Sequence, residues 1–101
     1  MAARRVLRGQ CFDLHYLAVA GSARLGLIVP KRLARAASLR NAIKRQGREA
    51  FRAVALEIPS CDVVLRLTRP LKGIRASDGN QKAVWRKEFD ALLQRLASAR
   101  P

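Results

Sequence analysis

Residues 24–52, RLGLIVPKRLARAASLRNAIKRQGREAFR, pass from the pattern of a strand to the pattern of a helix. Residues 24–29 are mainly aliphatic, which is typical of a strand, and Pro30 ends the run because proline has no N–H to donate to a sheet. Over residues 38–56 apolar positions recur at helical spacing, and Ser38 is a suitable N-cap. One arc, extended just past the helix, is apolar: Leu39, Ile43, Gly47, Ala50, Phe51, Val54 and Ile58.

The preceding segment, residues 11–20, also predicts a strand. Alternate positions divide it into two faces, Phe12, Leu14, Tyr16 and Ala18 against Asp13, His15 and Leu17. Gly21 and Ser22 indicate a tight turn, so residues 11–29 are interpreted as an antiparallel hairpin. Residues 1–10 are expected to be irregular.

Two further elements follow the central helix. Residues 61–69, CDVVLRLTR, predict a third strand after Pro59, and residues 69–80 are rich in turn formers. A last helix is predicted over residues 81–97, with one apolar face made of Trp85, Phe89, Leu92, Leu93 and Leu96. Residues 97–101 are expected to fray.

The predicted element order is β-β-α-β-α within one domain, residues 1–101. A helix that joins two strands makes them parallel neighbours, so the central helix places residues 24–29 and 61–69 side by side. The expected fold class is α+β, or an α/β sandwich, with a single mixed β-sheet and helices packed on it.

Charge sets the class of partner. The chain has 21 Lys and Arg against 7 Asp and Glu, a net charge of +14, which favours a nucleic acid. A membrane-surface protein is disfavoured because the apolar residues are spread over several segments. Cys11 and Cys61 are isolated and fit neither a zinc site nor a disulfide framework, so we expect buried thiols in the reducing cytoplasm.

The cations concentrate around the central helix. Arg40, Lys44, Arg48 and Arg52 recur every four residues with Asn41 and Arg45 beside them, and these six residues are called the basic ridge. Residues 31–52 hold eight Lys or Arg, including Lys31, Arg32 and Arg35, against one acid, Glu49. A face that only confers solubility normally mixes both signs, so the ridge favours phosphate binding over a merely solvated surface.

The same stretch resembles the signature of the bacterial ribonuclease P protein component, which reads R-x-G-x-x-V-x-K-K, then R-N-R-x-K-R and R-E-x-F-R. Twelve positions match in one register: Arg24, Gly26, Val29, Lys31, Arg40, Asn41, Lys44, Arg45, Arg48, Glu49, Phe51 and Arg52. Ala42 departs from the second arginine of R-N-R. Only about ten residues precede the first predicted strand, so the N-terminus is shorter than the family pattern.

The resemblance implies the protein subunit of an RNA-based endoribonuclease, a hydrolase and ribonucleoprotein of tRNA processing. Its partners would be ribonuclease P RNA and precursor tRNA, with magnesium held mainly by the RNA, catalysis by the RNA, and no protein oligomer in the holoenzyme. The implied fold is ribosomal protein S5 domain 2-like with a left-handed βαβ crossover. A cleft between helix and sheet would hold the 5′ leader. The expected RNA-binding residues are Lys31, Arg32, Arg35, Arg40, Asn41, Lys44, Arg45, Arg48 and Arg52.

Phe12 and Tyr16 have two interpretations. Stacking on unpaired leader bases would suit binding that tolerates any sequence. Alternatively, both are core residues under a helix.

Other functions are weighed against this one. A structural ribosomal or ribosome-associated RNA-binding protein fits the composition equally well, and only the twelve-residue register separates it. A DNA-binding module would need a second short helix before a recognition helix. An independent nuclease is disfavoured because the acids are scattered and His15 is the only histidine, so no catalytic or metal-binding residue is assigned to the protein.

Overall fold

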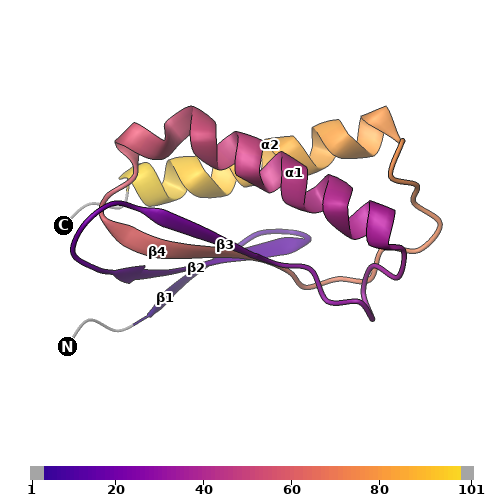
Figure 1. The fold of residues 1–101 in the computed structure, drawn as a ribbon, viewed down its shortest axis with the longest axis horizontal. Helices are drawn as coiled ribbons and strands as arrows, with labels where there is room; N and C mark the ends of the chain where they lie inside the picture. The colour runs from indigo at the N-terminus through magenta and orange to yellow at the C-terminus, as the bar shows by residue number, and fades with distance from the viewer. Residues whose placement is uncertain (1–3, 99–101) are drawn as a thin grey trace.

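The computed structural model describes residues 4–98, in which four strands form one mixed sheet and two long helices pack on it (Figure 1). This confirms the α+β class with a single mixed sheet. The sheet order is β1-β2-β4-β3. The elements in chain order are β1 (Arg5–Arg8), β2 (Phe12–Ala18), β3 (Arg24–Ile28), α1 (Ala37–Val54), the short 3-10 helix η1 (Ala55–Glu57), β4 (Cys61–Leu67) and α2 (Gly79–Ser98).

The predicted hairpin of residues 11–29 is wrong, because β4 lies between β2 and β3. β4 pairs antiparallel with β2, from Phe12 opposite Leu67 to Ala18 opposite Cys61, and parallel with β3. The reason is that β4 is the most buried strand, with four of its seven residues buried, and an interior place satisfies its backbone on both edges. Residues 19–23 span the width of this inserted strand, about 10 Å for two strand spacings.

The parallel pairing of β3 and β4 through α1 confirms the predicted crossover, and its hand stays a prediction. The expectation of irregular structure in residues 1–10 is wrong for Arg5–Arg8, which form β1 and pair antiparallel with β2. Likewise α2 continues to Ser98, so residues 97 and 98 are helical. The remaining parts of both terminal expectations, residues 1–3 and 99–101, lie outside the described residues.

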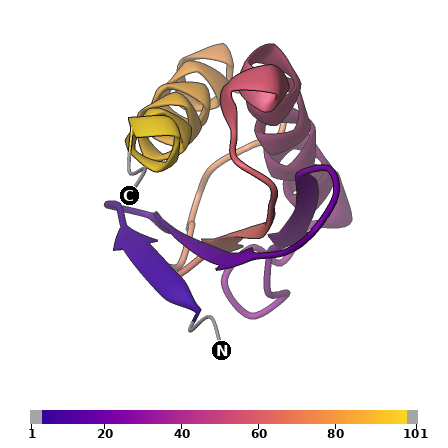
Figure 2. The ribbon, with the colours of Figure 1, turned by 90° about the vertical axis from the view of Figure 1, so that its left-hand side faces the viewer.

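Both helices lie on the same face of the sheet, side by side (Figure 2). Phe12 and Leu14 of β2 and the buried residues of β4 point toward them, and the rings of Phe12 and Phe89 are 4.3 Å apart. The predicted apolar face of α2 is confirmed, since its five residues are all buried. The opposite face of the sheet carries no helix of the described chain.

The start of α1 differs from its prediction. The N-cap is Ala36 rather than Ser38, and no side chain caps the first turn. The apolar arc is largely confirmed: Leu39, Ile43, Gly47 and Ala50 are buried, Phe51 and Val54 are half-buried, and Ile58 is buried beyond η1. At Gly47 an added Cβ would lie 2.6 Å from the Leu27 Cδ2 atom, so this glycine lets α1 pack closely on β3.

One carboxylate of α2 fixes the turn between β1 and β2. The Glu88 Oε2 atom accepts hydrogen bonds from the backbone N–H groups of Cys11, at 2.9 Å, and Phe12, at 2.7 Å. A Cβ added at Gly9 would lie 2.6 Å from the same oxygen, so glycine is required for the close approach. The first hairpin of the sheet is therefore tied to the last helix.

We expect Glu88→Ala to lower the free energy of unfolding by about 1–3 kcal/mol, because it leaves two backbone donors without their acceptor. Glu88→Gln retains a carbonyl oxygen and should lose less. Urea titration measures both changes. The control is Asp90→Ala on the same helix, which breaks only the exposed pair with Arg86; a Glu88→Ala loss no larger than this control would contradict the prediction.

Candidate nucleic-acid interface

The basic ridge runs along the outer side of α1. Asn41, Arg45, Arg48 and Arg52 are exposed, while Arg40 and Lys44 are half-buried beside the apolar arc. α1 can carry this row because its buried residues occupy the neighbouring arc of the helix and pack on β3 and α2. The structure therefore brings the predicted ridge residues together on one helix.

Arg40 has a contact that the sequence did not suggest. Its Nη1 atom donates to the backbone carbonyl oxygens of Ala34, at 3.0 Å, and Arg35, at 2.7 Å. This guanidinium fixes the segment before α1 but does not cap the N–H groups of the first turn. Arg40 is thus a positioning residue for the loop that carries Arg32 and Arg35, and RNA contact by its other N–H groups stays a prediction.

The ridge is not neutralised by acids. The ion pairs within residues 4–98 involve Arg8, Arg24 and Arg86, none of which belongs to the ridge. Glu49, the acid of α1, has its ion pair with Arg86 of α2, at 4.0 Å, rather than with a ridge residue. Lys31, Arg32 and Arg35 are also exposed, next to the start of α1. A polyanion could therefore meet a continuous row of free cations.

A further cation lies close to the ridge. A cavity of about 340 Å³ between α1 and the start of α2 is lined by Asn41, Arg45 and Lys82. Sequence reasoning missed Lys82, because nothing in the chain signals that the start of α2 lies beside the start of α1.

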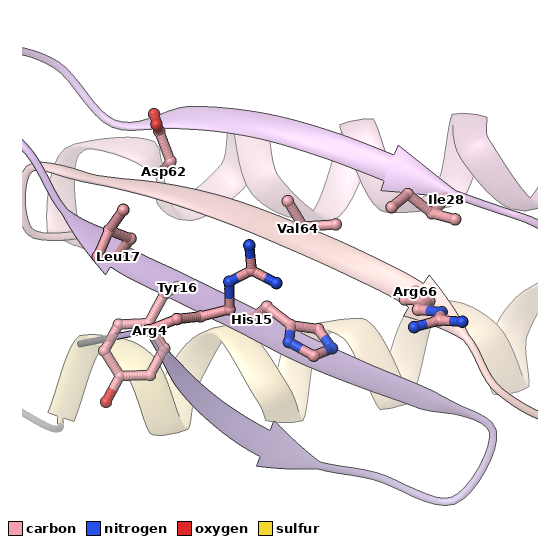
Figure 3. Close-up of a pocket in the computed structure, with 8 residues that line it drawn as sticks. All are labelled: Arg4, His15, Tyr16, Leu17, Ile28, Asp62, Val64 and Arg66. Atoms are coloured by element: carbon pink, nitrogen blue, oxygen red, sulfur yellow. The ribbon is translucent and has the colours of Figure 1, made fainter.

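The open face of the sheet holds a second pocket, of about 290 Å³ (Figure 3). Its floor includes Leu17, Val64 and Ile28, and Arg4 and Arg66 add positive charge. Ile28 is 48% exposed. His15 lines the same pocket, and its Nδ1 atom is buried without a hydrogen-bond partner. This combination of apolar floor and arginines suits an unstacked base with its phosphates.

Phe12 does not belong to that surface, and Tyr16 only borders it. Phe12 is 1% exposed and packs on Phe89, so its proposed stacking role is wrong. Tyr16 is half-buried and packs against the core, although it also borders the open-face pocket. The expected cleft between helix and sheet is filled by these core side chains. The free surface of the sheet is the opposite face.

Both cysteines are free thiols; Cys61 is buried, as expected, whereas Cys11 is half-buried. Burial raises the pKa of Cys11 from 9.0, and Glu88 adds to the increase while Arg69 opposes it. Burial, followed by the negative charge of Asp62, also raises the pKa of Cys61 from 9.0. Both groups are therefore protonated at neutral pH and behave as small apolar side chains. The hydrogen bonds from Arg24 to Asp62 raise the pKa of Arg24.

The fold and the ridge define a small α+β protein with a basic surface for nucleic acid. Residues 1–97 match the model of the ribonuclease P family. The ribonuclease P protein component of Bordetella petrii is 42% identical over 92% of this chain and 79% of its own length. That of Azoarcus sp. is 46% identical over 69% of this chain and 59% of its own length. The chain belongs to the ribonuclease P protein family.

Solved structures agree with this assignment of the fold. The ribonuclease P protein of Thermotoga maritima is 26% identical, with a TM-score of 0.69 over 91% of this chain and 83% of its own. That of Staphylococcus aureus, 24% identical, shares the fold with a TM-score of 0.74 over 90% of this chain and 79% of its own. Within the described residues, neither helix has the length and apolar character needed to cross a membrane.

Proposed function

We propose that this chain is the protein subunit of ribonuclease P and assists the removal of the 5′ leader from precursor tRNA. The observation that carries the proposal is the basic ridge, whose exposed cations form no ion pair within residues 4–98 and stand in the register of the family signature. The ridge would bind ribonuclease P RNA. The complex would work in the cytoplasm, without a protein oligomer.

The open-face pocket would hold the leader. Leaders differ in sequence, so binding must depend on phosphates and on apolar contact with bases rather than on base edges. Arg4 and Arg66 meet the first need, and Leu17, Val64 and Ile28 meet the second. Precursor tRNA should therefore bind the holoenzyme more tightly than mature tRNA, which lacks the leader.

Magnesium and catalysis are assigned to the RNA partner. The carboxylates of this chain do not fit a protein-bound magnesium site, because most of them already have partners. Asp13, Asp62, Asp90 and Glu49 face arginines, and Glu88 binds two backbone N–H groups. The chain would bind and orient the two RNAs, and the RNA would hydrolyse the phosphodiester bond.

The test is leader cleavage by the catalytic RNA of the same organism at low magnesium concentration. We expect wild-type protein to stimulate cleavage, and the Lys44→Ala, Arg45→Ala double variant to lose most of the stimulation. Lys87→Ala is the control, since Lys87 is exposed on α2 and belongs to neither surface. Absence of stimulation by wild-type protein would contradict the proposed function.

A further inference from the structure

Two basic loops meet at one end of the molecule. β3 and β4 are parallel, so the segments that follow them, residues 29–36 and 68–78, leave the sheet at the same edge. Figure 1 shows both segments at the right-hand end, where α1 and α2 also begin. The positive ends of two helix dipoles thus point toward this edge.

One hydrogen bond joins the two loops, and others fix the shape of the first loop. The Leu71 N–H donates to the Leu33 carbonyl at 2.8 Å, and the N–H groups of Leu33 and Ala34 donate to the Pro30 carbonyl. Arg40 of α1 binds the carbonyls of Ala34 and Arg35 on the other side. The surface between the loops is therefore built before any ligand arrives.

A cleft of about 560 Å³ lies between these loops and is called the end cleft. Its apolar floor consists of buried Leu33 and Leu39 with half-buried Leu71 and Ile74. Its rim consists of the exposed cations Arg32, Arg35 and Lys72. The floor offers an apolar contact and the rim offers positive charge.

The charge around the end cleft has one sign. Residues 31–36 and 68–76 contain no acid, and they contribute Lys31, Arg32, Arg35, Arg69, Lys72 and Arg75. The nearest acid along the second loop, Asp78, accepts a hydrogen bond from the Gln81 N–H and so caps α2. An apolar floor under cations suits a nucleotide, because its base is apolar on both faces and its phosphates are anionic.

We propose that the end cleft is a second RNA-binding site, which takes one unpaired nucleotide of the RNA bound by the basic ridge. The base contacts Leu71 and Ile74, and the flanking phosphates contact Arg35 and Lys72. Leu39 lines the cleft and Arg40 follows it on α1, so the ridge and the cleft form one path for a strand. This proposal depends on the proposed function only for the identity of the RNA that binds.

The decisive variant fills the cleft without removing charge. Ala36 is exposed, lines the cleft and has an extended backbone with no capping side chain, so Ala36→Trp removes no contact and adds a large ring. Ala37→Trp is the matched control, because Ala37 is also exposed but does not line the cleft. We expect Ala36→Trp to weaken binding of the catalytic RNA roughly tenfold, because the added ring excludes the base from the cleft, and Ala37→Trp to change it less than twofold.

A charge variant gives a second readout. Lys72→Gln should lower the slope of log affinity against log salt by about 0.7, as expected for one phosphate, while Lys87→Gln should not. Thermal unfolding of each variant shows that it is folded. If Ala36→Trp does not fold, the salt slopes of Lys72→Gln and Lys87→Gln decide whether the end cleft binds RNA.

Different results would contradict the end-cleft proposal and the proposed function. If wild-type protein stimulates leader cleavage but Ala36→Trp binds the RNA as Ala37→Trp does, the end cleft is not an RNA site. If wild-type protein neither stimulates cleavage nor binds the catalytic RNA, the proposed function fails, and the same variants are compared on single-stranded oligouridine. Equal affinities of the two variants for oligouridine contradict the end-cleft proposal, and weaker binding by Ala36→Trp supports it.

Discussion

Phe89→Ala is expected to lower the free energy of unfolding by about 3–5 kcal/mol, a large share of the roughly 5–15 kcal/mol that stabilises a typical domain. Phe89 has no exposed surface and joins α2 to the sheet through Phe12, with ring centroids 4.3 Å apart. Removal of the ring leaves a cavity that surrounding strands and helices cannot close, since both layers are fixed by backbone hydrogen bonds.

Chemical denaturation followed by circular dichroism measures this loss. Phe51→Ala is the matched control, because Phe51 is half-buried at the edge of α1, where water replaces the ring in part. It should cost roughly half as much. Equal losses for the two variants would mean that α1 is rotated relative to the structure described above.

Replacement of Arg45, Arg48 and Arg52 together by glutamine should weaken RNA binding most among surface changes. All three are exposed, and none pairs with an acid of the described chain, so each is free for a phosphate. Each lost phosphate contact lowers the slope of log affinity against log salt by about 0.7–0.9, so the triple variant should lose about 2–3. Binding of the catalytic RNA across a salt series measures this slope.

A second triple variant separates position from net charge. Arg8, Arg24 and Arg86 already face Asp13, Asp62 and the acids Glu49 and Asp90, so their replacement by glutamine removes the same charge from paired sites. Its slope should change by less than one phosphate contact. If the slope of log affinity against log salt falls equally for both triple variants, RNA binding depends on total charge and the ridge has no special role.

The sequence predicted the elements with long patterns well. Both helices and β4 were located because their apolar spacing extends over several turns or a full strand. It failed on the partner of β2, because the order of strands depends on pairing between distant segments, and β4 outcompetes the adjacent β3. It also missed β1, whose four residues are too few to show a period.

The functional residues also divide into those that the sequence could predict and those that it could not. The ridge could be predicted because all its residues lie on one helix. Period two correctly placed Phe12 and Leu14 on one face of β2, but only the structure shows that both helices cover that face. The end cleft depends on two loops that meet because β3 and β4 are parallel, and a linear pattern does not predict such a meeting. The contacts of Arg40 depend on how the chain turns just before α1.

The central position of β4 also sets an order of events during synthesis. β2 and β3 leave the ribosome early, yet neither has its main partner until residues 61–67 have been made. Pairings between such distant segments form slowly, because a long loop must close first. A nascent chain halted before Cys61 would therefore leave the facing edges of β2 and β3 unpaired, which makes synthesis of this single strand the step that removes two open strand edges at which aggregation begins.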